Sequence, residues 1–127
     1  MSNTPQSTLE KPLVKDLIRE KVLVLDGAMG TMSQEYKFTE GDYRGSRCAT
    51  YEHPLQGNND LLTLTQPEAI QTIHEKYLAA GADIIETNTF SCTTIAMADY
   101  YMEDLVYELN YEATRIALKA AEKYTLL

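Results

Sequence analysis

Cysteine, tryptophan and long apolar runs are scarce or missing in this 127-residue sequence, which has two cysteines and no tryptophan. Cys48 and Cys92 form no CxxC pair and no dense framework, so we expect reduced thiols instead of a disulfide scaffold. No stretch approaches the roughly 20 apolar residues of a membrane-spanning helix, and the polar start, Met1 to Thr8, lacks the basic-then-apolar order of a secretory signal. We therefore expect a cytoplasmic protein without a membrane partner.

Basic residues are also few. Lys and Arg number 11 against 19 Asp and Glu, which gives a formal net charge of −8 at pH 7. Nucleic-acid binding normally depends on clustered Lys and Arg, so this composition argues against a nucleic-acid partner. The length and the hydrophobic share of 44% suit one domain, or one piece of a larger domain, that buries about two-thirds of its unfolded surface.

Two short apolar segments predict buried strands. Val22 to Leu25, within VLVLDGAMGT, are four consecutive apolar residues, a pattern typical of a strand buried in a parallel sheet. Asp83 to Thr87, within ADIIETNTF, form a second short apolar segment that also ends in polar residues. Both segments are too short for a helix of ordinary length.

The sequence between and after these segments predicts two helices. Thr65 and Glu68 form a capping box, Pro67 is tolerated in the first helical turn, and Gly81 stands where a left-handed C-terminal cap belongs. From about Glu103 to Tyr124, apolar residues recur at helical spacing and predict a long helix.

Two other segments, residues 9–20 and residues 36–60, have less regular patterns. Leu9 to Glu20 has an amphipathic pattern and predicts a helix, preceded by a disordered tail over residues 1–8. Residues 36–60 are polar and dotted with glycines, which is typical of a functional or disordered loop.

The resulting order is helix, strand, loop, helix, strand, loop, helix. Two buried strands joined through a helix imply a parallel pair with a right-handed crossover, so we expect an α/β fold. In parallel α/β folds the ligand site lies beyond the carboxyl ends of the strands. The polar residues at those two ends are therefore the candidate site.

Six residues at these strand ends are predicted to bind substrate: Asp26, Gly27, Ala28, Thr87, Asn88 and Thr89. Gly27 and Gly30 let the backbone approach a ligand closely, and a helix that starts near Ala28 directs free N–H groups toward an anion. A carboxylate beside such amides suits a zwitterion, with the amides for its carboxylate and Asp26 for its ammonium group. We therefore infer an amino-acid substrate.

Structural alternatives apply to these residues, and Gly27 and Gly30 suit a role in the turn alone. Asp26 suits the N-cap of the following helix equally well, and Asn88 and Thr89 suit the cap of a helix over residues 93–100. His53 and His74 are isolated, and His74 lies between apolar helix positions, so surface or packing roles are favoured for both.

Other site types find little support. The stretch GAMG supplies only GxxG, no GxxxxGK[ST] occurs, and no two Cys or His residues have metal-ligand spacing. Neither histidine can be paired with a nucleophile from sequence alone. We predict no catalytic and no metal-binding residue in this chain.

Three long stretches resemble the N-terminal part of the homocysteine-binding (homocysteine S-methyltransferase) domain of cobalamin-dependent methionine synthase, over about Leu13 to Ala121: VLVLDGAMGTMSQEYKFTEGDYRG, GNNDLLTLTQPEAIQTIHEKYLAAGADIIETNTF and TTIAMADYYMEDLVYELNYEATRIA. The resemblance implies the N-terminal portion of a (β/α)8 TIM barrel, with two parallel βα units after an N-terminal helix. It also implies that zinc-activated homocysteine accepts a methyl group from methylcobalamin, which 5-methyltetrahydrofolate recharges. The DGAMGT and ETNTF stretches would then hold the amino-acid end of homocysteine.

The chain departs from this family in one respect. The family's zinc ligands are three cysteines on later strands, and Cys48 and Cys92 do not match them. We expect residues 9–127 to be a truncated homocysteine S-methyltransferase domain whose partners are homocysteine, the remainder of the barrel, and the folate and cobalamin domains. Such a fragment is expected to be inactive alone. The alternatives are a non-enzymatic amino-acid-binding module and an assembly partner of a barrel-completing chain.

Overall fold

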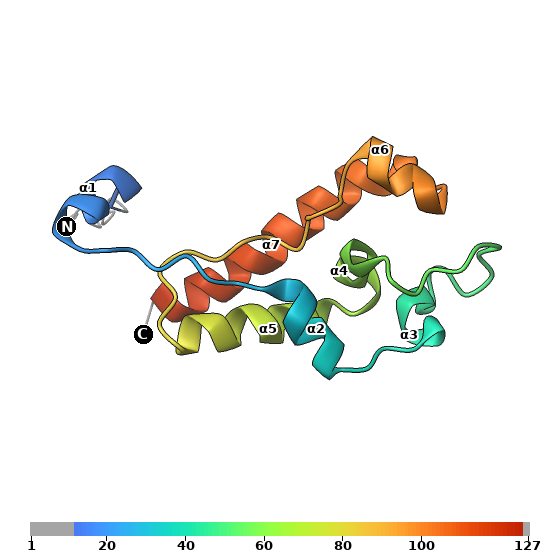
Figure 1. The fold of residues 1–127 in the computed structure, drawn as a ribbon, viewed down its shortest axis with the longest axis horizontal. Coiled ribbons are helices and arrows are strands. Elements are labelled where there is room, and N and C mark those ends of the chain that lie inside the picture. The colour runs from blue at the N-terminus through green and yellow to red at the C-terminus, as the bar shows by residue number, and fades with distance from the viewer. Residues whose placement is uncertain (1–11, 126–127) are drawn as a thin grey trace, which may run out of the picture.

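The computed structural model describes residues 12–125 (Figure 1). The expected tail over residues 1–8 and the first residues of the expected N-terminal helix lie outside this range. The described residues form short helices, 3-10 turns and two longer helices: α1 Val14–Glu20, α2 Met29–Glu35, α3 Glu40–Arg44, η1 Asn59–Leu61, α4 Leu62–Thr65, α5 Pro67–Ala79, α6 Thr94–Met97, η2 Ala98–Tyr100, η3 Glu103–Leu105 and α7 Val106–Thr125.

The expected α/β fold, the N-terminal portion of a (β/α)8 barrel with two parallel βα units, is wrong for this structure. Residues 12–125 are mostly helical and contain no strand and no sheet. The two segments expected as strands pair at one isolated parallel bridge, between Leu25 and Ile84, and their few backbone hydrogen bonds do not extend it into a ladder. A ladder needs several successive pairs with buried faces. Here Val22 is instead 90% exposed.

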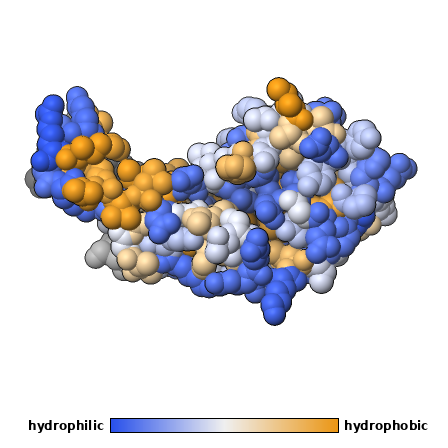
Figure 2. Space-filling model, in the orientation of Figure 1, coloured by the Kyte–Doolittle hydropathy of each residue, from blue (hydrophilic) through white to orange (hydrophobic). Residues whose placement is uncertain are grey.

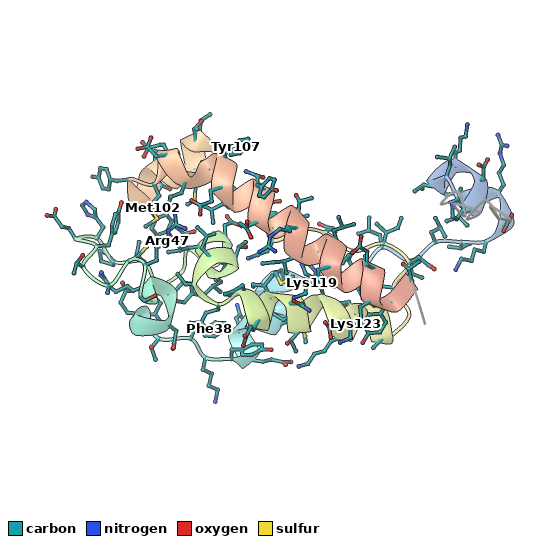
Figure 3. The ribbon with its side chains drawn as sticks, turned by 180° about the vertical axis from the view of Figure 1, so that it is seen from behind. Phe38, Arg47, Met102, Tyr107, Lys119 and Lys123 are labelled. Carbon is teal, nitrogen blue, oxygen red and sulfur yellow. The ribbon has the colours of Figure 1, made fainter. Side chains whose placement is uncertain are left out.

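The helices α5 and α7 form the body of the molecule. They pack side by side and run in the same general direction (Figure 1). The long helix buries the apolar positions expected from its helical spacing: Leu109, Ala113, Ile116, Ala117 and Ala120. Toward the C-terminal ends of the two helices, Lys123 on α7 forms an ion pair with Glu75 on α5. Its Nζ lies 2.7 Å from Glu75 Oε2 (Figure 3).

The start of α5 differs in one detail from its prediction. Pro67 occupies the first turn as expected, and Gly81 has a φ of +106° after the helix ends. The predicted capping box is wrong, because Gln66 is the N-cap and the Thr65 hydroxyl donates to the carbonyl of Leu61 instead. Thr65 belongs to the preceding α4, so its side chain is used within that short helix.

The hydrophobic core lies where the short helices meet α5 and α7. Its most deeply buried members come from widely separated segments: Leu55, Leu61, Leu62, Ile70, Met97 and Leu109, each at most 1% exposed. The core thus draws on the 36–60 segment that was expected to be a loop. In that segment Thr39 and Asp42 cap each other's backbone around the start of α3.

The N-terminal arm, residues 12–26, begins with α1, which lies apart from this body at the left of Figure 1, and its residues 24–26 return to pair with Asp83 and Ile84. Its helix α1 buries no residue. Apolar side chains gather on its surface in Figure 2, where Leu13, Val14 and Ile18 are all more than half exposed. Within residues 12–125, no helix has the length and apolar character needed to cross a membrane.

Candidate functional site

A pocket of about 920 Å³ opens between three backbone segments that are distant in sequence. They are residues 27–30 at the start of α2, residues 57–60 before and within η1, and residues 85–91 after the bridge, with further lining from α6 and η2. Ligand pockets typically measure roughly 300–1,000 Å³, so this volume is ample for a small molecule.

Gly27 brings the first and third segments together. A Cβ atom at this position would lie 3.2 Å from the backbone nitrogen of Glu86 and 3.8 Å from Cα of Ile85. Just before it, the Asp26 N–H donates to the Ile84 carbonyl at 3.1 Å. Glycine at position 27 therefore favours the close approach of two protein backbones, because a Cβ atom would force the neighbouring backbone to shift by a few tenths of an ångström, whereas among the described residues nothing lies within 4 Å of a Cβ atom at Gly30.

Residues 87–91 form one wall of the pocket without regular secondary structure. The hydroxyl oxygens of Thr87 and Thr89 lie 2.7 Å apart and share a hydrogen bond. The side-chain amide of Asn88, 5% exposed, donates to the Asn59 carbonyl at 2.9 Å and to Oγ1 of Thr63 at 3.2 Å. The Asn88 side chain thus ties this wall to the 57–60 segment.

Asp60 provides a second tie between the same two segments. Its carboxylate is 4% exposed, and Oδ2 accepts a hydrogen bond from the Ser91 N–H at 3.0 Å. Burial raises the pKa of Asp60, while the amides of Ser91 and Phe90 act in the opposite direction. No charged side chain in the described part of the chain contributes to this shift, so backbone N–H groups are what stabilise the buried charge.

The ionisable side chains that line the pocket are acidic, apart from the phenol of Tyr100. Asp60, Glu86 and Asp99 contribute carboxyl groups, and no Lys, Arg or His of residues 12–125 lines the pocket. Such a surface attracts an ammonium group and disfavours a ligand whose only charge is negative, such as a phosphate. A ligand carboxylate could be bound only by backbone N–H, hydroxyl and amide groups.

Five of the six predicted substrate-binding residues line this one pocket: Gly27, Ala28, Thr87, Asn88 and Thr89. Asp26 is not among the lining residues; it is exposed, and its Oδ1 accepts the N–H of Gly27 at 2.9 Å. The capping alternatives are wrong, because the N-caps of α2 and α6 are Ala28 and Thr93.

The sequence reasoning missed the whole 57–60 segment and the acidic residue on η2. Asn58, Asn59 and Asp60 all line the pocket, as does Asp99. A signal was present in the sequence, since three consecutive polar residues directly precede the apolar pair Leu61 and Leu62. A deeply buried segment holds the polar side chains next to it in place, whereas the polar side chains of a solvated loop are free to move.

A model of the homocysteine S-methyltransferase family matches residues 23–126, which is most of the chain. The chain belongs to the homocysteine S-methyltransferase family. The matched range contains all three pocket segments and begins within the N-terminal arm.

The resemblance implies a zinc ion for this family, and cysteine thiolates would be its ligands. Both cysteines are buried and free. Burial, with a smaller effect of the Asp60 charge, raises the pKa of Cys92 to about 11, whereas a metal ligand must be a thiolate. Within residues 12–125 no three His, Cys, Asp or Glu side chains are grouped to hold a metal ion. The described residues do not fit a zinc site.

Proposed function

We propose that this chain supplies the amino-acid-binding part of an enzyme that transfers a methyl group to homocysteine. The observation that carries the proposal is that the family match and the pocket coincide. Residues 27–30 and 85–91 both lie in the matched range, and both line a pocket of suitable size. Methyl transfer to homocysteine is the chemistry after which the family is named.

The chemistry of the pocket agrees with a zwitterionic ligand. The carboxylates of Glu86 and Asp99 provide negative charge for the ammonium group of homocysteine. The hydroxyl pair of Thr87 and Thr89, together with nearby backbone N–H groups, provides donors for its carboxylate. The role of these residues is to bind and orient the amino-acid end, which raises the effective concentration of the thiol at a reaction centre.

At a finer level, we propose that the enzyme is a methionine synthase that acts in the cytoplasm, with methylcobalamin as methyl donor and 5-methyltetrahydrofolate to recharge it. In this proposal the zinc site and the folate and cobalamin domains lie outside the described residues. The chain alone is then inactive, and methionine forms only when the rest of the enzyme is present.

The first experiment is an NMR titration of the 127-residue chain with homocysteine, recorded through the backbone amides. We expect shifts at Gly27 and at residues 87–89. Two analogues are the ligand controls: 3-aminopropanethiol, which lacks the carboxylate, and 4-mercaptobutanoate, which lacks the ammonium group. Both should bind at least tenfold more weakly, because each leaves half of the recognition groups without a partner.

Matched variants then locate the binding site. Thr89→Val should weaken homocysteine binding by about tenfold, since it removes one hydroxyl of the pair in the pocket wall. Thr114→Val, on the exposed face of α7, should have no effect. Equal affinity in both variants, or equal binding of 4-mercaptobutanoate and homocysteine, would contradict the proposal.

Activity is tested by adding the remaining part of a cobalamin-dependent methionine synthase as a separate polypeptide. Methionine formation that depends on both polypeptides supports the methyltransferase proposal. Homocysteine binding without activity in the mixture favours a non-enzymatic amino-acid-binding module. Association of the two polypeptides without homocysteine binding favours an assembly role.

A further inference from the structure

We infer that Asp60 is a positioning residue for the pocket: its buried carboxylate holds the wall formed by residues 87–91 in the conformation that presents Thr87 and Thr89. The inference rests on the proposed function for the identity of the ligand. It adds a role for a residue outside the six that the sequence predicted.

The wall has little packing of its own to hold it. Among residues 85–91 only Asn88 is buried, and Phe90 is 101% exposed, so its aromatic ring contributes no burial. None of these residues belongs to a helix or strand. Its conformation must therefore depend largely on hydrogen bonds to the neighbouring segment, since an irregular segment with a single buried side chain has little else to oppose its conformational entropy.

Asp60 is suited to this role because it is itself held rigidly. It lies in η1, whose N-cap Asn58 accepts the Leu61 N–H, and the next two residues, Leu61 and Leu62, are fully buried. On the other side, the hydroxyl of Tyr43 donates to Oδ1 of Asn59 at 2.7 Å. The carboxylate thus extends from a fixed segment to the Ser91 amide, and it complements the Asn88 side chain, which ties the middle of the wall to the same segment.

The ionised form of Asp60 holds the wall, but its burial lowers the free energy of unfolding of the chain. Burial outweighs the two amide hydrogen bonds, so the neutral form is better tolerated in the folded chain than the charged form. An amide at this position keeps a single acceptor oxygen for the Ser91 N–H, and that hydrogen bond lacks the charge of the carboxylate and is weaker. Asp60→Asn should therefore loosen the wall without lowering the stability of the fold.

The titratable group facing Asp60 from the wall side is the Cys92 thiol. Burial, with a smaller effect of the Asp60 charge, raises the pKa of Cys92 to about 11, so the thiol is neutral throughout the acidic and neutral range. Protonation of Asp60 therefore occurs beside an uncharged neighbour. Because the pKa of Asp60 is raised above its ordinary value of 3.8, the wall should loosen on acidification before ordinary aspartates are protonated.

The test compares Asp60→Asn with Asp104→Asn, which removes the same charge from an exposed position on η3. Amide hydrogen exchange should accelerate about tenfold or more at Ser91 in Asp60→Asn, and homocysteine affinity should fall about tenfold to a hundredfold, as for loss of a charge-assisted hydrogen bond. The midpoint of urea unfolding should not fall. Asp104→Asn should match the wild type in all three measurements.

The pH profile separates positioning from a merely structural role. In the wild type, Ser91 exchange corrected for its intrinsic pH dependence should rise as Asp60 is protonated, and Asp60→Asn should abolish this dependence. Unchanged Ser91 exchange in Asp60→Asn, or a parallel loss of urea stability and affinity, would overturn the inference. Absence of homocysteine binding by the wild type would overturn the proposed function alone, since the exchange and pH measurements need no ligand.

Discussion

His74, on α5, is fully buried, and neither ring nitrogen has a hydrogen-bond partner within the described residues. A neutral imidazole carries one donor and one acceptor, so both are left unsatisfied. Leaving a buried donor or acceptor without a partner costs about 1–3 kcal/mol. The sequence placed this histidine between apolar helix positions, which agrees with its packed location.

Replacing His74 with leucine should therefore stabilise the fold. Leucine has a similar size and no polar atoms, so the substitution removes the unsatisfied groups while keeping most of the packing. We expect the free energy of unfolding at neutral pH to rise by about 1–3 kcal/mol.

The same substitution should remove a sensitivity to acid. Burial lowers the pKa of His74 below its ordinary value of 6.5, so the unfolded chain takes up a proton that the folded chain does not. The free energy of unfolding should thus fall as pH drops below 6.5, by up to about 1.4 kcal/mol per pH unit, until the folded-state pKa is reached. His74→Leu should lack this fall.

Urea unfolding followed by far-ultraviolet circular dichroism, between about pH 5 and pH 7.5, measures both effects. His53→Leu is the control, because His53 is half-buried and stacks on Tyr101. It should leave the pH dependence that comes from His74 in place. A loss of more than about 1 kcal/mol in His74→Leu, with the acid sensitivity retained, would show that His74 has stabilising partners and would refute the reasoning.

Three further predictions concern stability and reactivity. Leu109→Ala should lower the free energy of unfolding by about 2–5 kcal/mol in urea denaturation, because Leu109 is 1% exposed, whereas Leu118→Ala, at 51% exposure, should cost far less. Gly81→Ala should cost about 1–2 kcal/mol in the same assay, since its φ of +106° is unfavourable for any side chain even though the space is open. Cys92 should react with iodoacetamide at least tenfold more slowly in the native chain than in urea at pH 8, because its pKa of about 11 and its burial both suppress the thiolate.

The helices that depend on local periodicity could be predicted from the sequence. Along α7, Leu109, Ala113 and Ile116 recur at helical spacing, and the structure buries all three. The strands could not be predicted, because strand formation is decided by what lies beside a segment. Residues 22–25 have the apolar pattern of a strand, but they meet only one partner, at one bridge, and remain largely exposed.

The candidate site could be predicted only in part, because some of its residues follow a local pattern and others are placed by contacts between distant segments. Glycine and polar residues that follow apolar segments pointed to residues 27–28 and 87–89, which line the pocket although the expected strands did not form. Backbone pairing of Asp26 with Ile84 is enough to bring those segments together. The polar run at residues 58–60 is visible in the sequence, but its place in the pocket was not predictable, since it depends on contacts with residues about 30 positions away.

The exposed extended segment at residues 22–26 has a consequence for the life of this chain in a cell. Proteases cleave exposed segments outside regular secondary structure most readily, and Val22, Val24 and Leu25 lie in such a segment, at 90%, 50% and 56% exposure. Cleavage there needs no global unfolding. The turnover of the chain would then follow the accessibility of these few residues, and mutations that strengthen the α5–α7 core would leave its half-life unchanged.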